Sequence, residues 1–297
     1  MNQYSFENFI MNCCKAREWN LRKWLKATLS KNGFRIVEDD YLSRRGSKYN
    51  NVHNMLAIRG NPEMCLVAHT DVCRDHFLSG TPDVFPVIKE QHGKKIIQDR
   101  DCETQVGGDD RLGVAINTWI ALNTGYDLGL LFTTDEEIGV VSANRVNFSE
   151  LLDCELLVQV DRGNHSNQIV NNIGGCQLCS DDILQELLQI SKDIGLPRVR
   201  TNGLLTDVLA IKENNMCKNA INMTCGYWNS FGAQPNEYID IQEARDTMKF
   251  VANIIKYYSL KEKSDTFTSL GDEYMTLQDR DYDLFSERAY MMEKGYY

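Results

Sequence analysis

The segment Leu128-Gly-Leu-Leu-Phe-Thr-Thr-Asp-Glu-Glu137 sets the expectation for the fold. Its first half is a continuous apolar run, and such a run suits a strand that is covered on both faces of a sheet. Two similar runs predict further central strands at Glu155–Val160 and Asn219–Met223. Shorter β-rich runs predict three earlier strands, at Phe34–Glu38, Met55–Ile58 and Met64–Ala68.

Segments with helical periodicity alternate with these strands. Apolar residues repeat at three and four from about Asp110 to Leu122, and again from Ile241 to Tyr258. Asp181 and Asp182 precede a third amphipathic segment as N-cap residues would. A peripheral hairpin is expected between Val84 and Gln98, turning at His92 and Gly93. The alternation predicts a three-layer α/β fold with a mostly parallel central sheet and helices on both faces.

The chain is expected to form one domain followed by an extension. Periodic segments end near residue 260, so residues 1–260 are predicted to form a single α/β domain. Residues 261–297 are polar, acidic and rich in tyrosine near the end. Such a composition predicts either an added helix or a partly disordered tail.

Composition and charge exclude several classes of partner. The net charge of −10 would repel nucleic acid and anionic lipid. No apolar run approaches the roughly 20 residues that cross a bilayer, and charged residues interrupt the first 24 positions. A cytoplasmic protein is therefore expected, with its ten cysteines reduced and mostly buried. Cys176 and Cys179 have no second close pair that would complete a structural zinc site.

The first chemical signal is Cys65-Leu-Val-Ala-His69-Thr-Asp71, an apolar strand that ends on a histidine. Residues two apart on a strand face the same way, so Asp71 can orient the His69 ring toward a metal. Taken alone, the pair is a weak signal, and a structural histidine is the better explanation for it.

Acidic residues follow at three further element ends. Asp109 and Asp110 open the helix after Gly107 and Gly108, where their charges favour a cation, and a doubled N-cap is an equal alternative. Glu136 and Glu137 follow a strand, where one could bind a metal and the other act as a general base, although a solvated turn is the plain alternative. Asp161 ends another apolar strand.

These four signals are expected to meet at the carboxyl edge of one sheet, where α/β proteins build their sites. So many carboxylates in one crevice would repel one another without a cation. Nitrogen and oxygen ligands favour Zn²⁺, with Mn²⁺ or Co²⁺ as substitutes.

The order of these motifs resembles the di-zinc exopeptidases that include peptidase T, carboxypeptidase G and the single-domain aminopeptidases (peptidase clan MH). The resemblance covers about residues 50 to 260. It rests on the four signals together with the segments Gly203-Leu-Leu-Thr-Asp207 and Cys225-Gly-Tyr-Trp-Asn-Ser230.

The resemblance implies a role for each matched residue. His69 and Asp161 would bind one metal ion, Glu137 the other, and Asp109 would bridge the two. Asp71 would orient His69, and Glu136 would be the general base for the metal-bound water. The peptide bond after Asp109 would be cis.

The chain departs from the family at two places. The interval between Asp161 and Cys225 is too short for the inserted lid or dimerisation domain that many relatives carry. Relatives also supply a final histidine ligand near the position of Phe231. Its replacement could be Gln234, Asn229 or His165, so we expect one tightly bound ion and a weaker second one. His53, His76 and His92 are expected on the surface or in loops.

Three functions remain open at this level. The chain could be a zinc aminopeptidase-like enzyme that cuts short peptides, an amidohydrolase acting on N-acyl amino acids, or a degenerate relative that only binds a ligand. Retention of both Glu136 and Glu137 favours an enzyme, whereas the missing histidine argues against one. Substrate preference and oligomeric state stay undetermined.

Overall fold

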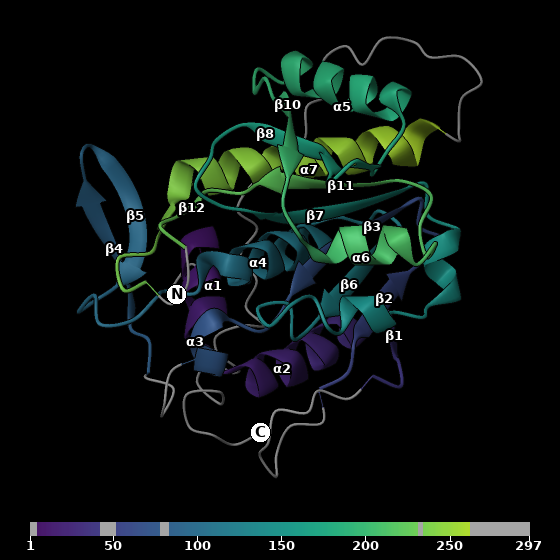
Figure 1. The fold of residues 1–297 in the computed structure, drawn as a ribbon. Coiled ribbons are helices and arrows are strands. Elements are labelled where there is room, and N and C mark those ends of the chain that lie inside the picture. Colours follow the sequence, from purple (N-terminus) through teal and green to yellow (C-terminus); the bar gives the residue numbers. More distant parts are fainter. Residues whose placement is uncertain (1–4, 42–51, 78–82, 231–233, 262–297) are drawn as a thin grey trace.

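A computed structural model describes residues 5–41, 52–77, 83–230 and 234–261 (Figure 1). Its main sheet has the strand order β1-β2-β6-β3-β7-β11-β8-β10, with β9 paired to β8. The bounds in that order are Arg35–Glu38, Met55–Arg59, Leu128–Thr133, Met64–His69, Leu156–Arg162, Ala220–Thr224, Gln168–Ile173 and Val199–Gly203, and β9 is Cys176–Gln177.

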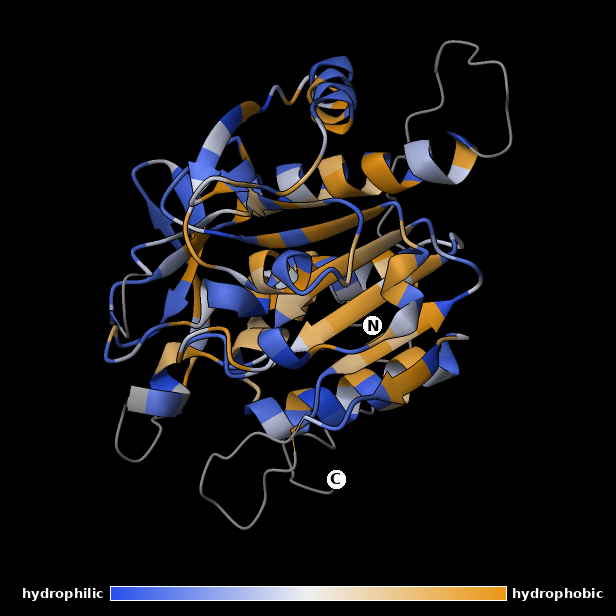
Figure 2. Cartoon of the chain, turned by 45° about the vertical axis from the view of Figure 1, so that its right-hand side comes forward, coloured by the Kyte–Doolittle hydropathy of each residue, from blue (hydrophilic) through white to orange (hydrophobic). Residues whose placement is uncertain are grey.

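The centre of the sheet is parallel, as predicted. Strand β3 runs parallel to both β6 and β7, and β11 runs parallel to β7. The pairs β1–β2, β2–β6 and β11–β8 are antiparallel, so the sheet is mixed toward its edges. Every residue of β3 and β6 is buried, which explains their continuous apolar sequence. Figure 2 shows the hydrophobic colour concentrated along these strands.

Helices cover both faces of the sheet, so the three-layer prediction is confirmed. One core cluster joins residues such as Leu66 and Leu130 to the helices α1 (Phe6–Lys15), α2 (Glu18–Lys31), α4 (Gly108–Asn123), α5 (Asp181–Asp193) and α7 (Ile241–Lys261). The other cluster joins Val67 and Leu131 to α6 (Asp207–Glu213) and to the 3-10 turns Ala143–Arg145 and Ser149–Leu152. Alternate residues of each strand thus face opposite helical layers.

The start of α5 differs from the prediction. Its N-cap is Ser180, whose hydroxyl accepts a hydrogen bond from the Ile183 backbone N–H at 3.3 Å. Asp181 and Asp182 lie in the first turn, where their charges suit the positive end of the helix dipole. The prediction that Asp181 and Asp182 cap this helix was therefore wrong, because the N-cap is the residue that precedes them.

A second, smaller sheet has the order β12-β13-β5-β4. Its hairpin of β4 (Pro86–Gln91) and β5 (Lys94–Asp99) turns at His92 and Gly93, both with positive φ, as the sequence predicted. Strands β12 (Tyr227–Trp228) and β13 (Tyr238–Asp240) come from much later in the chain, and β13 pairs with β5. This pairing carries the residues around Tyr227 to the start of α4.

No helix of the described residues is long and apolar enough to span a membrane. All ten cysteines are free, and all except Cys102 and Cys176 are buried, in line with the sequence-based expectation.

The proposed extension at residues 261–297 lies outside the described residues, apart from Lys261 at the end of α7. Because both core clusters are built from residues up to Tyr258, we expect a chain truncated after Lys261 to keep its cooperative thermal transition. Thermal melting followed by circular dichroism tests this, with the full chain as control. Loss of the transition would mean that the extension contributes to the core.

Candidate metal centre

The predicted residues meet at the carboxyl edge of the main sheet. Strand β3 ends on His69, β7 carries Asp161 near its end, and the loop after β6 carries Glu136 and Glu137. Because β3, β6 and β7 are parallel neighbours, their ends share one edge. Asp109 reaches the same place from the first turn of α4.

His69 is the centre of the cluster. Its Nε2 lies 3.1 Å from Asp109 Oδ1, 3.7 Å from Asp161 Oδ1 and 3.9 Å from Glu136 Oε2. One ligand atom each from His69, Asp109 and Asp161 lies within 4.8 Å of the other two, which is close enough for one ion to contact all three. The sequence predicted that these three residues would meet, and the fold brings their ligand atoms together.

The ring of His69 is held from its other nitrogen. Nδ1 lies 3.1 Å from the Asp71 backbone carbonyl oxygen and 3.4 Å from the Asp71 carboxylate. A proton on Nδ1 would be donated to these oxygens, which leaves the lone pair of Nε2 directed at the cluster. The orienting role expected for Asp71 therefore has a geometric basis, shared between its backbone and its side chain.

The Asp71 carboxylate also fixes the loop after β6. It accepts hydrogen bonds from the backbone N–H groups of Glu136 and Glu137 at 3.2 Å each, and His76 Nε2 lies 2.9 Å away. Asp71, His76 and Asp135 could form a second ion site by distance alone. We interpret this group as a hydrogen-bonding centre instead, because these donors already occupy the acceptor sites of Asp71. His76 was expected at the surface or in a loop, but it lies in the short helix α3 (Cys73–Phe77) and its side chain is almost fully buried.

The two adjacent acids of the Gly107–Asp110 loop have different roles. The Asp109–Asp110 peptide bond is cis, as the resemblance implied. Asp110 accepts from Gly113 N at 3.0 Å and from His69 N at 3.3 Å, so it caps α4 and binds the end of β3. Asp109 faces His69 instead. The hydrogen bonds of Asp110 fit the capping interpretation, and Asp109 lies where the ligand interpretation requires it.

Burial and crowding of like charges shift the acids of the site. Burial, followed by the negative charge of Asp109, raises the pKa of Asp161 to about 7 and that of Glu137 to about 9. Burial also raises the pKa of Glu136 well above its usual range. Burial alone would lower the pKa of His69, but Asp161, Asp109 and Asp71 raise it well above its ordinary value. Without a cation, the cluster is therefore electrostatically unfavourable at neutral pH.

Glu137 provides an independent indication of a cation. Its Oε1 atom is buried and has no hydrogen-bond partner among the described residues. A buried carboxylate oxygen without a partner is costly, and a metal ion would satisfy it. The donor set of one imidazole and several carboxylates also fits a divalent ion of the Zn²⁺, Mn²⁺ or Co²⁺ type.

These shifts predict how the metal-free protein responds to pH. Since the folded pKa values of Asp161, Glu137 and His69 all lie above their ordinary values, the folded chain binds protons more tightly than the unfolded chain. Stability should therefore fall as the pH rises from about 4 toward about 9. Melting in a chelating buffer should show this fall, and added Zn²⁺ should largely remove it. A melting temperature that rises with pH in the chelator would contradict the assignment.

The replacement for the missing histidine is not identified. Phe231 lies outside the described residues. His165, Asn229 and Gln234 are all exposed, and the side-chain amide of Asn229 donates to the Asn236 carbonyl. His165 is not part of the ligand group around His69. Among the described residues, no hydrogen bond joins Asn229 or Gln234 to His69, Asp109 or Asp161.

Several residues of the site were not singled out from the sequence. Gln159 donates to Asp161 Oδ2 at 3.0 Å and to Asp207 at 3.3 Å, and Tyr227 donates to Asp161 Oδ1 at 3.0 Å. Glu237 accepts from the backbone of the Gly107–Asp109 loop. Asp207 and Tyr227 lie in segments that carried the family resemblance, whereas Gln159 and Glu237 had no local signal.

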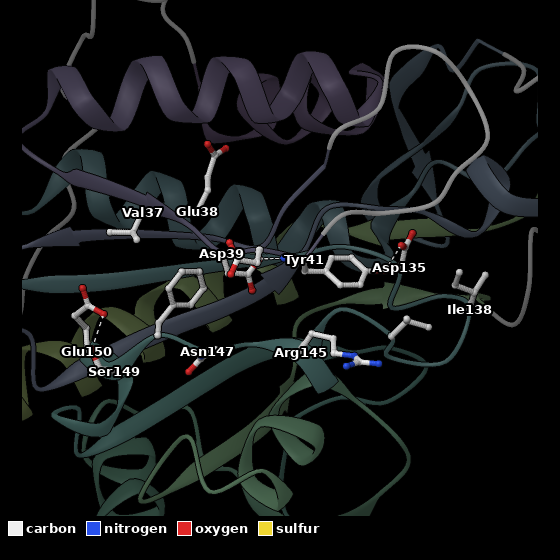
Figure 3. A pocket seen from close by; sticks show the side chains of 13 residues that line it. Val37, Glu38, Asp39, Tyr41, Asp135, Ile138, Arg145, Asn147, Ser149 and Glu150 are labelled. Carbon is white, nitrogen blue, oxygen red and sulfur yellow. Dashed lines mark hydrogen bonds between the residues drawn. The ribbon is translucent and has the colours of Figure 1, made fainter.

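An open pocket of about 1230 Å³ is lined by residues at the end of β1 and after β6, and none of the cluster residues lines it. Glu38 at the end of β1 and Phe132 near the end of β6 both pair with Met55, so the pocket opens at the same edge of the sheet. Its lining includes Asp135, the neighbour of Glu136. Tyr41 points toward Asp135 across the pocket and donates to it at 2.6 Å (Figure 3).

The fold and this edge cluster define a class: three-layer α/β proteins with a histidine and carboxylate site suited to a divalent cation. The sequence matches no protein-family model and no curated protein. Solved structures do match.

Several solved structures of peptidases share this fold. Aminopeptidase PepT from Bacillus cereus has a TM-score of 0.70 at 14% identity, over 87% of this chain and 99% of its own. A tripeptidase from Staphylococcus aureus has a TM-score of 0.67 at 14% identity, with the same coverage. The TET1 peptidase of Pyrococcus horikoshii, which can assemble into a tetrahedron or a large octahedral shell, has a TM-score of 0.61 at 10% identity, over 84% and 99%. The expected resemblance to the di-zinc exopeptidases is confirmed for the fold.

Proposed function

We propose that the chain is a metal-dependent peptidase that cleaves short peptides at the cluster around His69. The observation that carries the proposal is the convergence of His69, Asp109 and Asp161 within 4.8 Å of one another, with Glu136 beside them. The fold shared with an aminopeptidase and a tripeptidase supports peptides as the substrate class.

Each residue then has a chemical role. His69 and Asp161 would hold one ion, Glu137 a second, and Asp109 would contact both. A bound Zn²⁺, Mn²⁺ or Co²⁺ would polarise the scissile carbonyl group and acidify water. Glu136 would accept the proton from the attacking water and later deliver it to the leaving amine. Through its hydrogen bonds, Asp71 would hold the His69 ring and the backbone of Glu136 and Glu137 in place.

Two other functions compete with this one. An N-acyl amino acid amidohydrolase would use the same residues on a related amide bond. A binding protein without catalysis would explain the missing histidine, but it would leave the buried Glu136 beside His69 without a purpose. Glu136 beside His69 supports either hydrolase over the binding protein, and the fold shared with an aminopeptidase and a tripeptidase supports peptides as the substrate.

The test combines metal titration with hydrolysis. Calorimetric titration of metal-free protein with Zn²⁺ should give one tight site per chain and a second, weaker one, because no histidine takes the family's last ligand position. The loaded protein should then hydrolyse members of a panel of di- and tripeptides. Cleavage of N-acyl amino acids alone would favour the amidohydrolase, and absence of all hydrolysis with metal bound would favour the binding protein. Two equally tight sites would show that an unrecognised ligand completes the second one.

A further inference from the structure

The short hairpin of β12 and β13 contacts both acids that face His69. From β12, the Tyr227 hydroxyl donates to Asp161 Oδ1 at 3.0 Å. From the residue before β13, the Glu237 carboxylate accepts hydrogen bonds from Gly107 N at 2.6 Å and Asp109 N at 3.2 Å. The first contact acts on the side chain of Asp161, and the second acts on the backbone that carries Asp109.

Glu237 is an unusual residue for this position. Its side chain is completely buried, and among the described residues the positive charge that acts on it is Arg74, without a salt bridge between the two. Burying a carboxylate without a cationic partner is expensive, and only the two backbone N–H groups, with Arg74 in the vicinity, offset the penalty. If this carboxylate served only to bind a loop, the free energy lost by burying it would be large for that purpose. Its two oxygens, however, fix the loop on both sides of Gly108.

Packing leaves the hairpin little freedom to move away from the site. A Cβ atom added at Gly108 would lie 2.6 Å from Tyr227 Cβ and 3.1 Å from Ile239 Cγ1. One added at Gly163, two residues after Asp161, would lie 1.9 Å from the Tyr227 ring. At these two points, glycine allows the backbone of the site to approach the hairpin closely. The loop, the end of β7 and the hairpin form one closely packed unit.

We infer that the β12–β13 hairpin sets the distance between Asp109 and Asp161, with Glu237 and Tyr227 as its two positioning residues. Neither residue needs to contact an ion, because both act through ligands. The inference rests on the proposed function, since it concerns the same cluster. It adds that the affinity of the metal site depends on a strand pair belonging to the second sheet.

The experiment compares Glu237→Gln and Tyr227→Phe with the unmodified full-length chain. Zn²⁺ affinity is measured by competition with a chromophoric chelator, and the visible absorption spectrum is recorded with Co²⁺. Each variant should bind Zn²⁺ about 10- to 100-fold more weakly, as expected when a partner of a ligand is lost. Each should also alter the Co²⁺ spectrum, because that spectrum reports the arrangement of the ligands.

Glu243→Gln is the matched control. Glu243 accepts from the Trp228 indole N–H of the same hairpin at 3.1 Å, and its substitution removes the same charge without touching a ligand. It should leave Zn²⁺ affinity and the Co²⁺ spectrum unchanged.

The possible outcomes distinguish a failure of the positioning inference from a failure of the proposed function. Should Glu237→Gln fail to fold, Tyr227→Phe decides, since it removes only a hydroxyl. A purely structural role would lower the melting temperature of both variants but leave affinity and spectrum as in the unmodified chain, and that result would overturn the inference while the proposed function stands. If the unmodified chain binds no Zn²⁺, the proposed function and the inference both fall.

Discussion

Replacement of Glu136 by Gln is expected to abolish turnover while leaving the bound metal nearly unchanged. The amide keeps the shape of the side chain but cannot accept a proton at neutral pH. Glu136 Oε2 lies 3.9 Å from His69 Nε2, close to the ligand group without belonging to it. Its backbone is fixed by Asp71, so the substitution should not displace the loop. A general base contributes about 10²- to 10⁴-fold to rate, and a loss of at least that size is expected in kcat.

The measurement pairs steady-state peptide hydrolysis with metal content per chain. Glu186→Gln is a suitable control, because Glu186 on α5 pairs with Lys261 near the surface and is not part of the ligand group. It should keep full activity. Substantial residual turnover in Glu136→Gln would remove Glu136 from the role of base. Loss of metal from this variant would instead identify it as a ligand.

His69→Ala and Asp109→Asn are expected to lose metal as well as activity. His69 is the only nitrogen donor in the described ligand group, and Asp109 is the acid nearest to it, at 3.1 Å. Removal of a direct ligand should reduce affinity by more than the 10- to 100-fold that follows loss of a ligand's hydrogen-bond partner. These variants should therefore differ from Glu136→Gln in metal content, although all three are inactive.

Metal analysis after dialysis against a weak chelator distinguishes the loss of a ligand, which releases metal, from the loss of the base, which does not. The unfolding of each variant should also be followed in chelator, since removal of one acid from the crowded cluster relieves repulsion between like charges. We expect metal-free Asp109→Asn to be at least as stable as the metal-free parent chain at pH 8. Full metal occupancy in both His69→Ala and Asp109→Asn would refute the assignment of ligands.

Local sequence determined the strands of the sheet centre and the residues at their ends. Continuous apolar runs at β6, β7 and β11 predict strands buried on both faces, and each of the predicted bounds lies within about two residues of the observed ones. Because parallel neighbours end at one edge, His69, Asp161 and the Glu136–Glu137 pair were expected together. These features depend on a few consecutive residues, so periodicity was enough to find them.

Tertiary structure alone decided which residues support the cluster. Glu237 binds Asp109 across 128 residues of sequence, and this contact exists only because β13 pairs with β5. Glu18 and Arg22 of α2, which no sequence motif singled out, are buried against Thr70 and Thr133. Burial of a charged side chain is decided by its distant partners, and no local pattern records them. The sequence therefore specified the chemical groups of the site, while the order of the strands determined which neighbours hold them in place.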